Sequence, residues 1–387
     1  MTCFVLCWSL IIRSGRMGTV QTKLGVGLIG AHTWAEKAHL PGYAAHDRVR
    51  LVAICDIERD RAEAMARMFG AERVYTDHRE MLADAEVEMV DVCSPTHTHL
   101  PLSLDVIASG RHVLSEKPLH TQAGPAFDAA RAADAKGVRT KLGFTFRYSP
   151  AIRQIKAWID DGTLGEIFHV HGFEQNSQWL DPDVPLRQVT PGVRRDVLIP
   201  SSIIGYGSHL IDLMRWLGGE FSAVASTMRN FVPERVVRGE PGRQRIMIED
   251  GTVAIVEYGS GAQGLLQSSY IAVGNYPGVE IRVYGSKGAA IARLISEDGV
   301  AETLHFATAD AVEFRKIELA AAQLPPGTTV RTPWPELYYR NLVRFFVDEI
   351  LEDRPQECTF FDGAKSQEIV DAIILAHAER RWVKVGG

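Results

Sequence analysis

The sequence predicts an α/β chain in two parts: an N-terminal doubly wound parallel sheet, then an α+β part with a large, open, mostly antiparallel sheet. At 387 residues the chain exceeds what one hydrophobic core usually serves. Between residues 24 and 144, short apolar runs alternate with helical periodicity, which is typical of a parallel sheet. After Ser149-Pro150 the strand-like runs lengthen and glycine turns separate them, which favours antiparallel pairing. We therefore expect domains at 23–147 and 148–387.

The elements of the first domain follow from apolar runs with few charges, which indicate strands buried on both faces. We expect strands at 24–29, 50–55, 90–94, 112–114 and 140–144, and helices at 34–45, 58–69, 100–109 and 121–136. In the second domain we expect a helix at 151–160, strands at 167–175, 222–230, 252–258, 264–271 and 279–284, and helices at 338–351 and 364–380. Residues 181–202 lack periodicity and predict a long loop, a kind of segment that is usually functional or disordered.

Composition narrows the class of protein. The net charge is −6 and no dense lysine and arginine run interleaves with aromatic residues, so we expect no nucleic-acid partner. The five cysteines form no CxxC pair, which argues against a disulfide framework or a zinc site and favours a reducing, cytoplasmic compartment. The apolar stretch 4–12 is too short to cross a bilayer, so we expect no membrane partner. We expect residues 1–22 to be an extension with Met17 as the true start; a degenerate targeting signal is the alternative.

A glycine turn after the first expected strand suggests a dinucleotide site. Residues 25–30 match G-x-G-x-x-G literally, but that register would make the polar stretch 20–23 the strand. We place the turn at Gly30 instead, followed by His32, Thr33 and Trp34. His32 stands where a second glycine would let the backbone approach a pyrophosphate, so weaker or shifted cofactor binding is the expected consequence. Alone, such a loop is more often ordinary turn chemistry.

Asp56 supports the same site because it ends the second expected strand, near the spacing at which an acid meets the adenosine ribose. Its carboxylate would repel a 2′-phosphate and so favour NAD over NADP. The alternative is an N-cap for the helix at 58–69. Arg59 and Arg61 follow so closely in sequence that NADP stays open.

Glu116 and Lys117 follow the strand at 112–114 and precede Pro118. The carboxyl ends of parallel strands form the ligand crevice of such a sheet. A lysine there loses its proton more easily than in water, because desolvation disfavours the ammonium. The alternative is a solvated Glu-Lys pair in a loop, which is what most such pairs are.

Five motifs in order resemble the glucose–fructose oxidoreductase / inositol dehydrogenase / MocA (Gfo/Idh/MocA) family, over about residues 24–385. They are the turn Ser94-Pro95-Thr96 with His99, the lysine motif 110–118, the junction 143–150, the segment 207–212 and the closing stretch 361–383. The resemblance implies an N-terminal NAD(P)-binding Rossmann domain and a C-terminal open sheet that joins subunits of a homodimer or homotetramer. It also implies a last helix that packs back toward the Rossmann domain. The implied activity is hydride transfer between nicotinamide and a secondary hydroxyl or ketone of a sugar, cyclitol or sugar derivative.

By that resemblance the catalytic residues are Lys117 and His209. His209 would take the hydroxyl proton near neutrality, and the ammonium of Lys117 would stabilise the developing alkoxide. No metal site is expected. The expected cofactor contacts are Gly30, His32, Thr33, Trp34, Asp56, Ser94, Pro95, Thr96, His99, Glu116, Lys117 and Arg147.

One position departs from the family pattern. Members often carry an aspartate four residues before the histidine, and here that position is Gly205. We therefore expect Lys117 to carry a larger share of the proton chemistry. The departure also leaves two alternatives open: a glycoside-acting relative that oxidises a sugar hydroxyl transiently, and a non-catalytic NAD(H)-binding regulator.

On the substrate side, planar hydrogen-bonding groups stand next to an aromatic ring, a combination typical of carbohydrate sites. The expected substrate contacts are Gln178, Trp179, Arg187 and Tyr206. Arg187, together with Arg194 and Arg195, suits a carboxylate or phosphate group; surface arginines in a solvated loop are the alternative.

Overall fold

The computed structural model describes residues 23–186, 194–274, 278–294, 299–311 and 313–386. Within these ranges the first sheet is parallel throughout, in the strand order β3-β2-β1-β4-β5-β6. Its strands are β1 (Leu24–Ile29), β2 (Val49–Cys55), β3 (Arg73–Tyr75), β4 (Met89–Val92), β5 (His112–Ser115) and β6 (Thr140–Leu142). The predicted doubly wound sheet is confirmed, although β3 was not foreseen.

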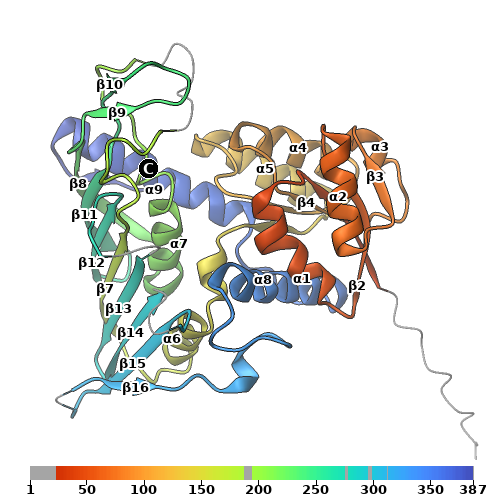
Figure 1. Cartoon of the computed structure of the whole chain (residues 1–387). Coiled ribbons are helices and arrows are strands. Elements are labelled where there is room, and N and C mark those ends of the chain that lie inside the picture. The colour runs from red at the N-terminus through yellow and green to blue at the C-terminus, as the bar shows by residue number, and fades with distance from the viewer. Residues whose placement is uncertain (1–22, 187–193, 275–277, 295–298, 312, 387) are drawn as a thin grey trace, which may run out of the picture.

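Helices cover both faces of this sheet: α4 and α5 lie above it in Figure 1, and α1 and α8 below it. The helices of the first part are the π-helix η1 (Ala35–His39), α1 (Leu40–Ala44), α2 (Arg59–Phe69), α3 (His78–Leu82), α4 (Thr96–Ala108) and α5 (Ala123–Lys136). The helix expected at 34–45 is therefore present, and its middle part is the π-helical stretch η1, which continues directly into α1. Pro41, in the first turn of α1, has no N–H to continue the preceding ladder of hydrogen bonds.

The second sheet has the order β16-β15-β14-β13-β7-β12-β11-β8-β17. Its strands are β7 (Ile167–Gln175), β8 (Phe221–Arg229), β11 (Gly251–Tyr258), β12 (Gln263–Ser269), β13 (Gly278–Gly285), β14 (Gly288–Leu294), β15 (Thr303–Thr308), β16 (Arg315–Ile317) and β17 (Val383–Lys384). The β7–β12 pair is parallel and its neighbours are antiparallel. This confirms the expected mostly antiparallel sheet.

Among the described residues, helices cover one face of the second sheet and leave the other uncovered (Figure 1). They are α6 (Pro150–Asp160), α7 (Gly207–Gly218) and α9 (Phe360–Glu379), and the short 3₁₀ turns η2 (Thr145–Tyr148) and η3 (Ala321–Gln323) lie outside the sheet. On the opposite face Ile255 is about half exposed and Val253 is 39% exposed. A separate hairpin, β9 (Glu234–Val236) and β10 (Arg243–Arg245), packs on a small cluster of its own.

The last quarter of the chain returns to the first sheet. Helix α8 (Trp334–Leu351) packs against η1 and α1. The N–H of Leu142, in edge strand β6, donates to the carbonyl of Cys358 at 2.7 Å. Helix α9 contacts α5 through the rings of Phe127 and Phe361, whose centroids are 5.5 Å apart. None of the helices in the described ranges is both long and apolar enough to cross a bilayer.

Candidate active site

The chain leaves β1 through a turn at Gly30, as the chosen register predicts. Gly30 has a φ of +99°, and a Cβ there would lie 2.2 Å from the carbonyl oxygen of Cys93. Only glycine fits both conditions. The side chains of His32 and Thr33 that follow are exposed, so this turn offers backbone and side-chain donors at the carboxyl edge of the sheet.

Asp56 lies at the end of β2 and is buried. One carboxylate oxygen accepts the N–H of Ala31 at 2.8 Å, and the other accepts the N–H of Glu58 at 2.9 Å and Nη1 of Arg61 at 3.3 Å. The N-cap residue of α2 is Glu58 rather than Asp56. Asp56 therefore links the Gly30 turn to the end of β2, and its contact with a ribose stays a prediction.

The end of β4 supplies the next group of predicted residues. Pro95 precedes α4, Thr96 begins it, and the hydroxyl of Ser94 accepts a hydrogen bond from Oγ1 of Thr98 at 2.7 Å. His99 is buried, and its ring nitrogens lie 2.8 Å from the carbonyl oxygens of Pro118 and Ser94. His99 thus fastens the turn after Lys117 to α4, and these two contacts occupy both of its ring nitrogens.

Glu116 is the centre of a buried polar cluster. Its Oε1 accepts hydrogen bonds from Nε1 of Trp34 at 3.0 Å and from the hydroxyl of Tyr339, and it lies 3.2 Å from Nε2 of His39. Its Oε2 accepts the N–H of Lys117 at 3.1 Å. The predicted cofactor contacts Trp34 and Glu116 therefore meet each other, and together they fix the backbone at Lys117.

A second buried acid completes this cluster. Nδ1 of His39 lies 2.7 Å from Oδ2 of Asp91, which also accepts the hydroxyl of Tyr43 at 2.8 Å. Burial lowers the pKa of His39, but the Asp91 carboxylate outweighs it and holds this pKa well above its usual range. Burial raises the pKa of Glu116, but the hydrogen bond and charge of His39 outweigh it and the net shift is downward. His39 is thus an imidazolium between two carboxylates.

Lys117 points from this cluster toward the second domain. Its Nζ donates to the carbonyl of Gly205 at 3.2 Å and lies 5.6 Å from the ring centroid of Tyr206. Burial lowers the pKa of Lys117, while the charges of Glu116 and Glu174 oppose that shift. The lysine is therefore closer to losing its proton than one in water.

His209 lies in the first turn of α7 and is 5% exposed. Its ring packs against Phe146 and Phe144, with centroid distances of 4.7 and 5.6 Å. Burial, and then the charge of Lys117, hold the pKa of His209 well below its usual range, so the imidazole is neutral. Its buried Nδ1 has no hydrogen-bond partner among the described residues. The structure thus brings the two predicted catalytic residues into one electrostatically coupled site.

The predicted substrate residues gather around Tyr270, which follows β12. The ring of Trp179 lies edge-on to Tyr270 at 4.7 Å, and the ring of Tyr206 lies at 6.3 Å from Tyr270 and 6.2 Å from His209. The N–H of Gln178 donates to Oδ1 of Asn176 at 3.2 Å.

The predicted arginine contacts have other outcomes. Arg187 lies outside the described residues. Arg194 pairs with exposed Asp196, and Arg195 pairs with Glu240.

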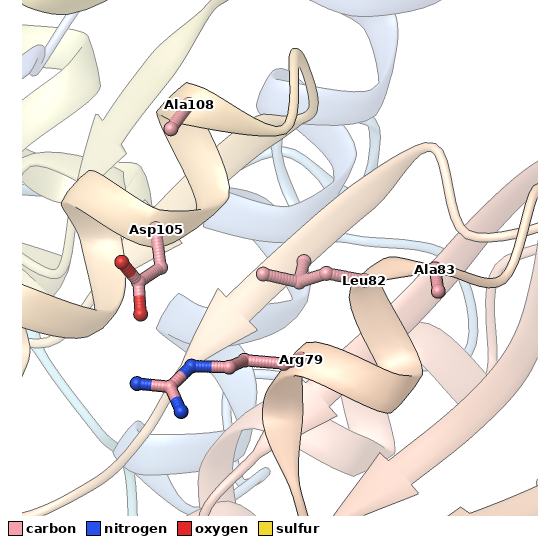
Figure 2. A pocket seen from close by; sticks show the side chains of 5 residues that line it. All are labelled: Arg79, Leu82, Ala83, Asp105 and Ala108. Atoms are coloured by element: carbon pink, nitrogen blue, oxygen red, sulfur yellow. The ribbon is translucent and has the colours of Figure 1, made fainter.

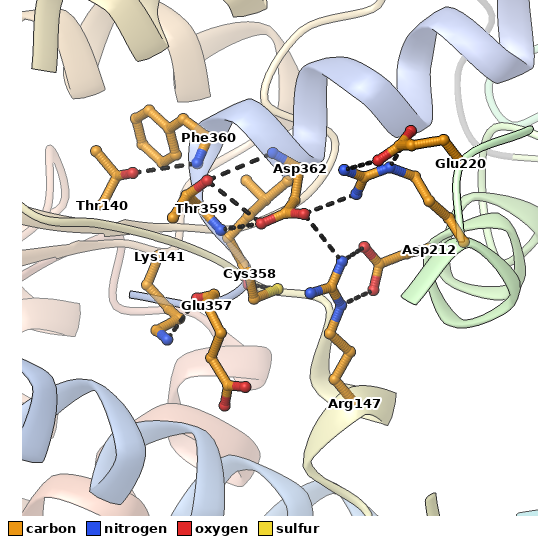
Figure 3. A network of polar contacts seen from close by, with 12 residues as sticks. Thr140, Lys141, Arg147, Asp212, Glu220, Glu357, Cys358, Thr359, Phe360 and Asp362 are labelled. Atoms are coloured by element: carbon orange, nitrogen blue, oxygen red, sulfur yellow. Dashed lines mark hydrogen bonds and ion pairs between the residues drawn. The ribbon is translucent and has the colours of Figure 1, made fainter. Parts of the chain in front are cut away.

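Arg147 has a structural role in addition to its expected cofactor contact, which stays a prediction (Figure 3). Its guanidinium is buried and donates to both oxygens of Asp212, at 2.6 and 2.5 Å, and to Asp362 at 3.3 Å. Asp362 also accepts from Arg215 at 2.6 Å. Arg147 therefore ties η2 to α7 and α9 through Asp212 and Asp362.

Sequence analysis did not single out His39, Asp91, Tyr339 or Tyr270. Asp91 carried a usable signal, because a carboxylate inside an apolar strand requires a buried partner. For Tyr270 the sequence holds no such signal, since its neighbours in space come from distant segments.

Two surface pockets lie away from these residues. One, of about 370 Å³, lies between α3 and α4 and is lined by Arg79, Leu82, Ala83, Asp105 and Ala108 (Figure 2). The other, of about 300 Å³, lies on the uncovered face of the second sheet beside His171, Ile255 and Trp382. In the part of the chain that the structure describes, no three His, Cys, Asp or Glu side chains are placed to hold a metal ion.

Comparison with known proteins identifies the family. An oxidoreductase family model with an NAD-binding Rossmann fold matches residues 24–144, and a GFO/IDH/MocA C-terminal domain model matches residues 152–291. The chain belongs to the Gfo/Idh/MocA oxidoreductase family. The resemblance stated from the motifs is thereby confirmed, as are the expectations of an enzyme and of NAD as its cofactor.

Relatives of this oxidoreductase cover nearly its whole length. The levoglucosan dehydrogenase of Pseudarthrobacter phenanthrenivorans is 27% identical, over 94% of this chain and 98% of its own. The inositol 2-dehydrogenase of Rhizobium meliloti is 26% identical, with the same coverage. A solved structure of levoglucosan dehydrogenase in complex with NADH and levoglucosan matches with a TM-score of 0.82 and 25% identity, over 95% of this chain and 100% of that one.

The residues of this Gfo/Idh/MocA oxidoreductase fit NAD. Gly30 follows β1 at the carboxyl edge of the sheet, where a dinucleotide pyrophosphate approaches in such sheets, and the exposed side chains of His32 and Thr33 come directly after it. The Asp56 carboxylate lies at the end of the neighbouring strand. Lys117 follows β5 on the same edge, so the cofactor and the predicted catalytic pair would share one crevice.

Proposed function

We propose that this oxidoreductase moves a hydride between NAD and a secondary hydroxyl or ketone of a sugar or cyclitol. The observation that carries the proposal is the pairing of Lys117 with a buried, neutral His209 beside the crevice of an NAD-binding domain. The names of the relatives, levoglucosan dehydrogenase and inositol 2-dehydrogenase, support the same substrate class.

The two side chains divide the proton chemistry. NAD supplies the hydride acceptor. His209 is neutral and can accept the hydroxyl proton as the hydride leaves. The ammonium of Lys117, held on the Gly205 carbonyl, stabilises the negative charge that develops on the substrate oxygen. In the direction of reduction the same groups act in reverse.

The substrate would lie against the aromatic side chains that border this pair. Trp179 and Tyr206 offer ring faces and Gln178 offers a planar amide, the combination expected for a polyhydroxylated ring. We keep these three residues as proposed substrate contacts, and Gly30, His32, Thr33 and Asp56 as proposed cofactor contacts.

A substrate panel tests the proposal. Levoglucosan, myo-inositol and methyl glucosides are incubated with the full chain and NAD, and the absorbance of NADH is followed. We expect at least one of them to yield NADH. Tight NADH binding without oxidation of any compound would favour a regulator, and release of an aglycone without net NADH would favour a glycoside-acting enzyme.

We also propose that the uncovered face of the second sheet joins subunits of a homodimer or homotetramer. Ile255 and Trp382, which border this face, are 53% and 44% exposed. Light scattering coupled to size exclusion measures the mass. An I255D variant with an unchanged mass would argue against this face.

A further inference from the structure

The hydroxyl of Tyr270 occupies the space in which a side chain at position 205 would begin. A Cβ built on Gly205 would lie 2.0 Å from this hydroxyl oxygen and 3.3 Å from Cζ of the same ring. The backbone of Gly205 is not among those with a positive φ. The position therefore requires glycine because of space, and the occupant of that space is Tyr270.

One peptide group connects Tyr270 to Lys117. The carbonyl of Gly205 accepts hydrogen bonds from Nζ of Lys117 at 3.2 Å and from the hydroxyl of Ser208 at 2.8 Å. The N–H of the same peptide belongs to Tyr206 and donates to the Tyr270 hydroxyl at 3.3 Å. A peptide that donates at one end accepts more strongly at the other, so each bond reinforces its neighbour.

The Tyr270 ring is itself held firmly. Tyr270 is 5% exposed, and its carbonyl accepts the N–H of Trp179 at 2.9 Å. Trp179 packs edge-on against Tyr270, and the guanidinium of Arg235 lies 5.4 Å from the ring centroid of Trp179. Arg235 forms a buried ion pair with Asp250 at 3.1 Å, and the carbonyl of Asp250 accepts the N–H of Tyr270 at 2.9 Å. These contacts hold the Tyr270 hydroxyl in one position.

We propose that Tyr270 is a positioning residue for Lys117: through the Gly205–Tyr206 peptide it fixes the ammonium in the site, and its hydroxyl fills the space of a side chain at position 205. The inference rests on the proposed function only where it gives Lys117 a part in catalysis. The contacts themselves are independent of the substrate.

The charged and titratable groups that face Lys117 come from several elements. Glu116 follows β5, Glu174 lies in β7, and Tyr206 and His209 lie at the start of α7. Burial raises the pKa of Glu174 to about 8. Replacement of Tyr270 by phenylalanine changes none of these groups and removes only the hydroxyl.

The first experiment measures Lys117 directly, without substrate. The full chain and its Y270F variant are labelled with an amine-reactive reagent over a range of pH, and modification of Lys117 is followed by mass spectrometry. We expect the labelling midpoint of Y270F to move to lower pH by about 0.1–0.7 unit, because a hydrogen bond to a charged group loses roughly 10–30% of its strength. An unchanged midpoint would overturn the proposal whether or not the enzyme oxidises any compound of the panel.

Kinetics give a second readout that mere packing would not move. With the best substrate of the panel, kcat of Y270F should fall and its pH profile should shift by the same amount as the labelling midpoint. The KM for NAD should stay within about twofold, since Tyr270 belongs to the second domain. A fall in kcat with an unshifted pH profile would mean that Tyr270 only supports the fold.

The space-filling part is tested by a suppressor pair. Gly205→Ala should lower the midpoint of thermal unfolding and disturb Lys117 labelling, because the new methyl group meets the hydroxyl. Gly205→Ala combined with Y270F should recover the unfolding midpoint and return Lys117 labelling to that of Y270F alone, since the methyl group then meets only Cζ at 3.3 Å and the Ser201 carbonyl at 3.2 Å.

A matched control is Gly124→Ala, which enters open space in α5 and should change neither readout. A single variant as stable as the wild type, or a double variant no better than the single one, would show that the hydroxyl does not fill this space.

Discussion

The Arg147 cluster and the Lys117 site are both buried and polar, yet Asp362 in the first and Glu174 in the second have pKa values shifted in opposite directions. In the first, burial opposes ionisation of Asp362, but Arg147 and Arg215 outweigh it and lower the pKa of Asp362 to about 2. In the second, burial raises the pKa of Glu174 to about 8. It also lowers the pKa of both Lys117 and His209.

The difference lies in how the acids and bases are matched. Arg147 has two carboxylates within hydrogen-bond distance and so ties α7 to α9. Burial raises the pKa of Asp212 to about 6 in spite of Arg147, whereas Asp362 stays ionised far below neutral pH. Around Lys117 the nearest hydrogen-bond acceptor is a neutral carbonyl, and Nδ1 of His209 has no partner among the described residues. Buried charges that are paired with opposite charges hold two helices together. Buried groups without such a partner can exchange protons near neutral pH.

Removal of Lys117, whose nearest hydrogen-bond acceptor is a neutral carbonyl, should have the largest effect, a loss of turnover. We expect K117A to lose about 10²–10⁴-fold in kcat, because a group that acts on the reacting oxygen is gone. Affinity for NADH, measured by calorimetry, should remain close to that of the wild type. Exposed Lys136, at the end of α5, provides the control K136A. Near wild-type turnover in K117A would remove Lys117 from the site.

Removal of Arg147, which is paired with carboxylates, should instead lower the stability of the fold. R147M leaves Asp212 buried without its cation and Asp362 with Arg215 alone, and we expect the free energy of unfolding to fall by about 3–5 kcal/mol. Denaturant titration measures it. R194M, in an exposed pair, should leave it nearly unchanged. If R147M were as stable as R194M, the packing of α7 against α9 would not depend on the Arg147 ion pairs.

The two acids should give opposite pH dependences. Glu174 keeps its proton in the folded chain up to about pH 8, whereas an unfolded glutamate loses it near pH 4. Its contribution to stability is therefore lost as the pH rises between these values, and E174Q should gain roughly 3–5 kcal/mol over the wild type from pH 5 to 8.5.

For Asp362 the sign reverses. Its folded-state pKa is depressed, so its contribution is present above about pH 4 and is lost as the pH falls toward 2. D362N should be less stable than the wild type by roughly 2 kcal/mol at neutral pH, and this gap should close in acid. Parallel pH profiles for E174Q and D362N would contradict the contrast drawn between the two clusters.

The smallest effect concerns cofactor choice. Asp56→Ser removes the carboxylate and leaves Arg61 without that partner. We expect the ratio of kcat/KM for NADP to that for NAD to rise by about 10-fold, as loss of one repulsion near a surface suggests. An unchanged ratio would leave Asp56 with only its contacts to Ala31 and Glu58.

The sequence was most informative where local rules decide the structure. The strand at 167–175 and the turn at Gly30 follow from periodicity and from the need for an apolar strand before the turn. The strand β14 was missed because alanines fill much of it, and alanine is a weak strand former. The three residues of β3 are too few for a pattern.

Side-chain partners were harder to predict, because they come from far along the chain. Arg147 lies 65 residues from Asp212 and 215 from Asp362, so a motif alone could not separate an ion-pair role from a cofactor contact. Tyr206 lies 64 residues from Tyr270. The sequence drew attention to Gly205 as a missing acid, and only the fold relates that glycine to Tyr270.

The bond between Leu142 and Cys358 has a consequence for synthesis of the chain. Edge strand β6 is complete at residue 142, but the acceptor for this N–H is added more than half the chain later. Tyr339, which bonds Glu116, also comes late. A nascent chain on the ribosome would therefore carry its nucleotide-binding half unfinished until the last helices emerge. We expect that half, expressed alone, to expose the β6 edge and to associate through it.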